Sequence, residues 1–303
     1  MNDDIRDFFI LIDEIMAKYL VSTTKKTLYH YTSPEALKNI IEKKQLWFSD
    51  VHYLNDKSEI EYTRKLILDI LANRKDLDPD FHANIDSCIR FNCNSKKVLY
   101  YPRPGSQKYY IASFSTAPDE LSLWNYYTKN DKKGGYNIGF NAEKFMNLIA
   151  TERYNGKKII FGKIMYIKRR QTQLINFILD KFNEKYTNTK DDDKKEILTL
   201  RCAGFMNTMS LFFKDSSFSA EKEYRFVFVD YRYKKVKKDI NKDYRILNGI
   251  FIPYIKLDFT SDIIDSITPS PLIDYKQCSG LCEFLKENGL NIIPSKSSIP
   301  LRY

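Results

Sequence analysis

The order of strand-like and helix-like segments is the feature that most constrains the fold of this chain. Short segments rich in alternating apolar, β-branched and aromatic residues predict strands at 27–31, 45–49, 109–115, 136–140, 158–167, 224–231, 246–251, 263–267 and 291–293. Two long helices, predicted at 171–186 and 194–213, follow each other with only a polar loop between them. Because strands and helices do not alternate regularly, we expect an α+β fold on a split, mostly antiparallel sheet rather than a doubly wound parallel sheet.

Helical periodicity predicts the other helices around these strands. Ser33 and Pro34 suit the N-cap and the first position of one of them. Further helices are predicted at 3–20, 57–74, 81–91, 120–127 and 275–287. We therefore expect an N-terminal amphipathic helix within residues 1–26 and a single α+β domain over residues 27–303. The N-terminal helix would dock on this domain or on a second copy, which would make the protein a homo-oligomer.

Composition limits the classes of protein to consider. A chain of 303 residues that is 43% hydrophobic can bury a sizeable core. Its first residues are acidic and no apolar run approaches the length of a membrane span, so we expect neither export nor a membrane location. The odd number of cysteines, five, without a CxxC pair indicates reduced thiols in the cytoplasm. The net charge of +10 favours polyanionic partners, although solubilising surface lysines explain it equally well.

Several familiar chemistries lack their sequence signals. The chain has three histidines and none stands in a spacing typical of metal ligands, so we expect no metal site. The glycine-rich phosphate loops GxGxxG and GxxxxGK[ST] are absent, as is the nucleophile motif GxSxG. A Rossmann site, a P-loop and an α/β-hydrolase site are therefore unsupported.

Three separated clusters carry the residues that a site could use. The first is YHYTS, from Tyr29 to Ser33, where His30 and Thr32 are two positions apart on a predicted strand and share a face. Alternatively, His30 is a hydrogen-bonded core histidine, and Thr32 and Ser33 cap the next helix.

The second cluster is SFSTAPDELSLWNYY, from Ser113 to Tyr127. Ser113 and Ser115 share one face of a strand, while Trp124 and Tyr127 are spaced to present their rings together on a helix. Such rings can stack on a base or on nicotinamide. An aromatic stripe packed in the core is the alternative.

The third cluster is FSAEKEYRFVF, from Phe218 to Phe228. Glu221, Glu223 and Arg225 alternate with other residues, which predicts two carboxylates and a guanidinium on one strand face. A carboxylate there could stabilise the positive charge that develops when a bond at a sugar carbon breaks. The alternative is a solvated strand face with an ordinary Glu–Arg pair.

Together these clusters resemble a bacterial family known as domain of unknown function 2971. Its ordered motifs correspond here to YHYTS, LWFSDVHYLNDKSE, SFST, LWNYY, GGYNIGF and FSAEKEYRF, from about Tyr29 to Glu223, with a further match at the tail SSIPLR. The layout is similar to that of ADP-ribosyltransferases, in which a His or Arg on the first strand, an aromatic or Ser-containing second motif and a late Glu surround NAD.

The resemblance implies an ADP-ribosyltransferase-like fold and a set of roles. Glu223 would bind the ribose hydroxyl and stabilise the cation as nicotinamide leaves, and Glu221 would help to position the acceptor. His30 would hydrogen-bond the nicotinamide ribose with support from Thr32, and Trp124 or Tyr127 would stack on the nicotinamide. Further binding side chains would be Tyr29, Ser115 and Arg225. NAD would be the substrate of an ADP-ribosyltransferase or NAD glycohydrolase. The enzyme would act as a toxin or anti-phage effector, with a protein or nucleic acid as acceptor.

A second hypothesis is a non-catalytic module that binds nucleic acid or a nucleotide. The segment from Tyr231 to Arg245, YRYKKVKKDINKDYR, interleaves lysines with aromatic residues. A charged hairpin loop in solvent explains this segment equally well.

Overall fold

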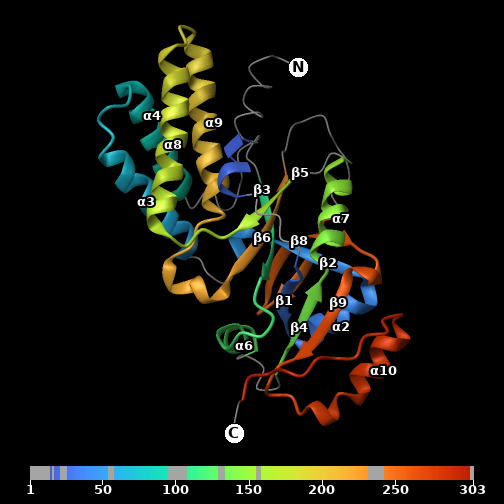
Figure 1. The fold of residues 1–303 in the computed structure, drawn as a ribbon. Helices are drawn as coiled ribbons and strands as arrows, with labels where there is room; N and C mark the ends of the chain where they lie inside the picture. Colours follow the sequence, from blue (N-terminus) through green and yellow to red (C-terminus); the bar gives the residue numbers. More distant parts are fainter. Residues whose placement is uncertain are drawn as a thin grey trace. The chain divides into compact units, whose positions relative to one another are not determined.

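The computed structural model describes residues 14–15, 17–20, 26–53, 58–94, 108–128, 134–154, 158–230 and 242–300. These residues form two compact units (Figure 1). The helical unit lies within the ranges 1–21, 54–106 and 163–218, and the sheet unit lies within 22–53, 107–162 and 219–303. The expectation of one domain over residues 27–303 stays a prediction.

The helical unit is built on four long helices. They are α3 (Ser58–Ala72), α4 (Pro79–Asn94), α8 (Lys168–Thr187) and α9 (Asp192–Ser210). Helices α8 and α9 lie side by side, and α9 also packs on α4 (Figure 1). Asp191 caps the start of α9, because its carboxylate accepts a hydrogen bond of 3.1 Å from the backbone N–H of Lys194.

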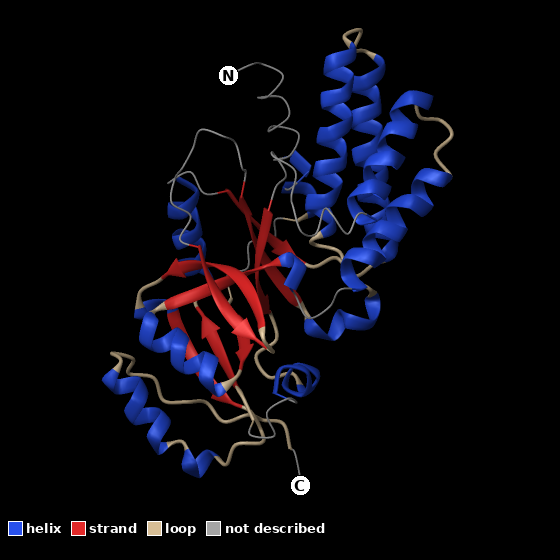
Figure 2. Ribbon diagram, turned by 180° about the vertical axis from the view of Figure 1, so that it is seen from behind, coloured by secondary structure: helices blue, strands red, loops and turns tan. Residues whose placement is uncertain are grey.

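The sheet unit contains a nine-stranded, curled sheet, drawn in red in Figure 2. Its strands are β1 (Leu28–Thr32), β2 (Gln45–Asp50), β3 (Lys108–Ser115), β4 (Tyr136–Phe140), β5 (Lys158–Lys163), β6 (Glu223–Asp230), β7 (Lys242–Leu247), β8 (Ile250–Asp258) and β9 (Ile264–Pro269). Seven strands follow the order β7-β8-β2-β3-β1-β4-β9, while β6 pairs with β3 and β5. The pairs with a described register are antiparallel, so the α+β class with a mostly antiparallel sheet is confirmed.

One face of the sheet carries the apolar core of this unit. Its helices are α2 (Pro34–Lys43), α7 (Ala142–Tyr154) and α10 (Ser279–Glu287), each of which contributes buried side chains. Phe114 is 3% exposed and meets three other rings edge to face, those of Phe140, Phe145 and Phe226, at centroid distances of 5.5, 5.2 and 5.4 Å. Edge-to-face contacts add to the free energy gained from burying these rings. The short helix α6 (Leu121–Thr128) packs instead on β1, with a separate small cluster.

Most predicted elements are confirmed, with shifted ends. Residues 14–15 and 17–19 are helical, and the rest of the helix predicted at 3–20 lies outside the described residues. The sequence analysis missed α7, although Asn141 caps it by accepting a hydrogen bond of 3.0 Å from the N–H of Lys144.

Two predicted strands are wrong. The segment 246–251 is a hairpin, because Asn248 and Gly249 have φ angles of 50° and 74° and form a tight turn between β7 and β8. The segment 291–293 pairs with no strand of the described residues. Among the described helices, none is long and apolar enough to cross a membrane.

We expect Phe114→Ala to lower the free energy of unfolding by about 3–5 kcal/mol, because it leaves a cavity among three rings. Ile293→Ala is the control, since Ile293 is 83% exposed, and it should change the value by less than about 0.5 kcal/mol. Urea denaturation followed by circular dichroism measures both. Equal effects of the two substitutions would contradict the described core.

Candidate functional site

A row of side chains crosses the second face of the sheet. The strand registers pair Tyr29 with Gly139 and with Ser115, and they pair Ser115 with Glu223. Directly paired residues of neighbouring strands point to the same face. Tyr29, Ser115 and Glu223 therefore share one face, which we call the polar face.

Gly139 leaves room for this row. A Cβ atom built at Gly139 would lie 2.2 Å from the Ser266 hydroxyl and 3.4 Å from the ring of Tyr29. The distance of 3.4 Å is at the lower limit of ordinary contact, and the distance of 2.2 Å is impossible unless neighbouring atoms move. The GxxIGF-type motif thus contains a glycine because two side chains of the polar face pack over it.

Glu223 and Arg225 form a buried ion pair on β6. The Arg225 Nε donates to Glu223 Oε1 over 2.7 Å, and a terminal guanidinium nitrogen donates to Oε2 over 2.9 Å. The two residues are only 5% and 3% exposed. A two-point guanidinium–carboxylate contact fixes the plane of the carboxylate, so Glu223 is held in one orientation.

The start of β6 is clamped to the end of β3. The Ser115 hydroxyl donates to the carbonyl oxygen of Glu221 over 2.7 Å and accepts from the N–H of Ala117 over 3.0 Å. Lys222, between the two acids, has a left-handed φ of 45°. Glu221 consequently ends a 3-10 turn rather than beginning the strand, and the predicted alternation of Glu221 with Glu223 and Arg225 is wrong at Glu221.

A small aromatic cluster adjoins Tyr29 on the polar face. The Tyr31 ring meets the Trp124 ring edge to face at 4.8 Å, and Ile299 packs against both from the C-terminal tail. The Tyr31 hydroxyl donates to the carbonyl oxygen of Ala117 over 3.0 Å and accepts from the N–H of Glu120 over 3.1 Å. Burial raises the pKa of Tyr31, so its hydroxyl stays protonated at neutral pH.

Trp124 is part of this packed cluster. It is 1% exposed, and its Nε1 donates to Asp119 over 2.7 Å. Its ring therefore lies in a core in this structure, which was the alternative that the sequence left open. The side chain of Tyr127, the other predicted stacking residue, lies outside the described residues.

Asp119 ties the C-terminal tail to this cluster. Its carboxylate accepts hydrogen bonds from the backbone N–H of Ser298 over 2.7 Å and from the hydroxyls of Ser297 and Ser298 over 2.9 Å each. Burial by itself would raise the pKa of Asp119, but the hydrogen bonds from Trp124 and the two serines outweigh it and lower the pKa. Asp119 was not among the predicted site residues, although the SSIPLR-type tail motif could have indicated that the tail has a fixed partner.

His30 and Thr32 lie on the other face of β1. His30 is paired with Ile138 of the apolar core, and its ring lies 5.6 Å from that of Phe114. Its Nδ1 is 3.0 Å from the carbonyl oxygen of Ser113, which fixes the proton of the neutral imidazole on Nδ1. The resemblance implied that His30 and Thr32 lie together with Glu223. The structure does not bring them together.

The environment of His30 disfavours its charged form. Burial is the largest cause that lowers the pKa of His30, and the Arg245 guanidinium lowers it further, against the hydrogen bond to Ser113. His30 keeps partial exposure, and an uncharged imidazole with a backbone partner is typical of a structural histidine at the margin of a core.

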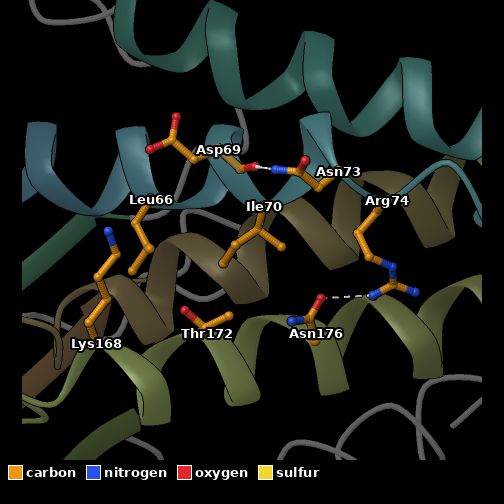
Figure 3. Close-up of a pocket in the computed structure, with 8 residues that line it drawn as sticks. All are labelled: Leu66, Asp69, Ile70, Asn73, Arg74, Lys168, Thr172 and Asn176. Atoms are coloured by element: carbon orange, nitrogen blue, oxygen red, sulfur yellow. Dashed lines mark hydrogen bonds between the residues drawn. The ribbon is translucent and has the colours of Figure 1, made fainter.

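The helical unit contains a pocket between α3 and α8 (Figure 3). Its volume is about 270 Å³, and Leu66 and Ile70 line its apolar side. Arg74 at its end donates to Asn176 over 2.9 Å and pairs with two aspartates. No predicted site residue lines this pocket. Among the described residues, no group of His, Cys, Asp or Glu side chains gathers in a way that could hold a metal ion.

The comparisons with known proteins give one match. The family model described as Protein of unknown function (DUF2971) matches residues 123–226, which supports the resemblance over that segment. The matched segment contains most of α6, the whole of β4 and the beginning of β6 with its Glu223–Arg225 pair. No curated protein matches the chain. No solved structure matches it either.

Because the neutral imidazole is favoured in the fold, His30 should make stability depend on pH. Above the ordinary histidine pKa of about 6.5 it has no effect, and below this value the unfolded chain takes up a proton more readily than the fold does. As the pH is lowered from 7.5 to 5.5, we therefore expect the midpoint temperature of thermal unfolding to fall less in His30→Gln than in the wild type. His52→Gln, at an exposed position, should follow the wild type. Parallel curves for all three proteins would contradict this account.

The hydrogen bonds to Asp119 predict a second pH effect. Its lowered pKa adds stability that is complete above the unfolded-state pKa of about 3.9 and is lost as pH falls through the lower pKa of the folded state. Asp119→Asn should lower the free energy of unfolding by about 1–3 kcal/mol at pH 7, and this difference should shrink below about pH 4. Asp192→Asn, on an exposed helix start, is the control for urea denaturation. A difference that does not change with pH would contradict the proposed network.

Proposed function

We propose that the polar face is a site for NAD-dependent ADP-ribosyl transfer or NAD cleavage, centred on Glu223. The observation that carries the proposal is the row of Tyr29, Ser115 and Glu223 on three adjacent strands, with the carboxylate held in one orientation by Arg225. An oriented carboxylate beside hydroxyl and aromatic side chains is the arrangement that a reaction at a ribose carbon requires.

The chemistry asked of Glu223 is electrostatic. In NAD the bond between the ribose C1 and the nicotinamide nitrogen breaks, and its electron pair goes to that nitrogen, which becomes neutral. The ribose is left as an oxocarbenium-like cation, which an ionised carboxylate stabilises. An acceptor hydroxyl, amine or water then bonds to C1 and loses a proton.

Arg225 acts on Glu223 through its two N–H donors. They fix the carboxylate plane, so no reorganisation is needed when the cation forms. Ser115 acts through the backbone, because its hydrogen bond to Glu221 sets where β6 begins. Tyr29 is half-buried and offers a ring and a hydroxyl on the same face.

The proposal differs from the sequence-based assignment at three residues. It gives His30 and Thr32 no role, because they lie on the apolar face of β1. It also gives Trp124 no stacking role while the ring is packed against Tyr31. Since Glu223 is 5% exposed, a substrate must displace the groups that cover this carboxylate before it can reach it.

We expect Glu223→Gln to lower the rate of nicotinamide release from NAD by about 100-fold or more, because a neutral amide cannot stabilise the ribose cation. Glu283→Gln, on an exposed position of α10, is the control and should keep the wild-type rate. Release is measured by chromatography, with protein lysate, nucleic acid and water offered as acceptors. The proposal would be refuted by a folded Glu223→Gln protein with full turnover. It would also be refuted if the wild type released no nicotinamide with any of these acceptors.

Loss of the charge at Glu223 also removes one partner of a buried ion pair, which destabilises proteins by about 3–5 kcal/mol. A second variant separates the two effects. Replacing Glu223 by Leu and Arg225 by Met removes both charges together, and we expect it to recover stability but not activity. Circular dichroism checks the fold of each protein before the assay.

A non-catalytic nucleic-acid or nucleotide-binding module is the second candidate. Most of the segment 231–245 that suggested it lies outside the described residues. The described residues add one favourable feature, a Trp47 ring stacked on Tyr254 at 4.2 Å with Lys43 and Lys256 each over one of the two rings. Binding of single-stranded DNA or RNA that falls steeply with salt would favour this candidate over the enzyme.

A further inference from the structure

The hairpin of β7 and β8 exposes an unusual amount of apolar surface. Five large side chains around its Asn248–Gly249 turn are 47% to 66% exposed: Tyr244, Ile246, Leu247, Ile250 and Phe251. Single exposed apolar residues need no explanation, but three of these, Tyr244, Ile246 and Phe251, share one face of the hairpin and together mark an interaction surface.

Among the described strands, β7 ends the order of the sheet, so one of its sides is an edge there. In the register with β8, Tyr244 stands opposite Pro253, which has no N–H to donate. The N–H of Tyr244 donates to the Asp243 carboxylate over 2.8 Å. The backbone groups of Tyr244, and by alternation those of Lys242 and Ile246, therefore point away from β8. Edge groups of this kind are a template for pairing with another strand.

Asp243 and Arg245 share one face of the hairpin. Asp243 bonds to Lys256 at 2.6 Å and to the hydroxyl of Tyr254 at 3.2 Å. Arg245 donates to the Ser49 hydroxyl over 3.1 Å, while its Nε is buried and has no hydrogen-bond partner among the described residues. A buried guanidinium nitrogen without an acceptor is unfavourable, so a carboxylate brought to Arg245 would stabilise the strand.

We propose that β7 pairs antiparallel with β7 of a second copy of this chain, about a twofold axis at Tyr244. This register places Lys242 beside Ile246 of the partner subunit and Asp243 beside Arg245 of the partner subunit. By symmetry the Asp–Arg pair forms twice, once on each side of the axis. The register thus supplies each Arg245 with a carboxylate and gives partners to the edge backbone groups of Lys242 and Ile246.

The apolar side chains that share a face with Tyr244 add to the contact. The backbone groups of the two edge strands and the two Asp243–Arg245 pairs supply its polar part. The surface lies within the sheet unit, and the proposal does not depend on the function proposed for Glu223.

The test is the mass of the purified full chain in solution, measured by light scattering and by sedimentation over a range of concentrations. We expect twice the chain mass of 35.9 kDa for the wild type. Ile246→Lys combined with Phe251→Lys should raise the dimer dissociation constant by about 100-fold or more, because it puts charges into an apolar contact. Ile293→Lys, at an exposed position outside the hairpin, should leave the dimer unchanged.

A charge exchange tests the register itself. Asp243→Arg alone and Arg245→Asp alone should each weaken the dimer by about 10-fold or more, whereas the two substitutions together should recover it at least in part. Deletion of residues 1–20 tests the alternative contact through the N-terminal helix and should leave the dimer intact. A monomeric wild type at all concentrations, or a dimer unaffected by the hairpin substitutions, would overturn the proposal, and so would a charge exchange without recovery.

Discussion

The buried ion pair of Glu223 and Arg225 is the constraint on which the polar face depends. Both charges lose their hydration when β6 joins the sheet, and the penalty is offset only if the two-point contact forms completely. Turning β6 over would push this pair into the apolar core, so β6 keeps the orientation in which Ser115 stands opposite Glu223. The same orientation places Tyr224, Phe226 and Phe228 on the opposite face, where they complete the apolar core. The ion pair and the three aromatic residues thus require the same orientation of β6.

The alternation of side chains along a strand explains where sequence reasoning succeeded and where it failed. It correctly grouped His30 with Thr32, Ser113 with Ser115 and Glu223 with Arg225, because each pair lies two positions apart on one strand. It could not relate one pair to another, since a face is defined across strands only by their register. The register of β1 with β3 sets Tyr29, and not His30, in the row of Ser115 and Glu223. A motif order shared with a family therefore does not by itself place the residues of different motifs on one face.

Other features were absent from the sequence analysis for local reasons. The Asn248–Gly249 turn is the pattern that most strongly indicates a hairpin, yet apolar residues on both sides made the segment resemble one strand. Lys222 adopts a left-handed conformation that no propensity of lysine suggests, and this breaks the alternation before Glu223. Asp119 and its partners are 178 and 179 positions apart, a separation at which a single sequence carries no signal.

That separation has a consequence for the order in which the molecule is completed. Strand β1, α6 and Asp119 leave the ribosome long before Ser297 and Ser298 are synthesised, so for most of translation the carboxylate of Asp119 lacks three of the donors that it has in the finished fold. The corner formed by Tyr31, Trp124 and Ile299 can close only after the chain through Ile299 has emerged. This corner is then among the last parts of the sheet unit to be completed, because the tail residues arrive after its other members.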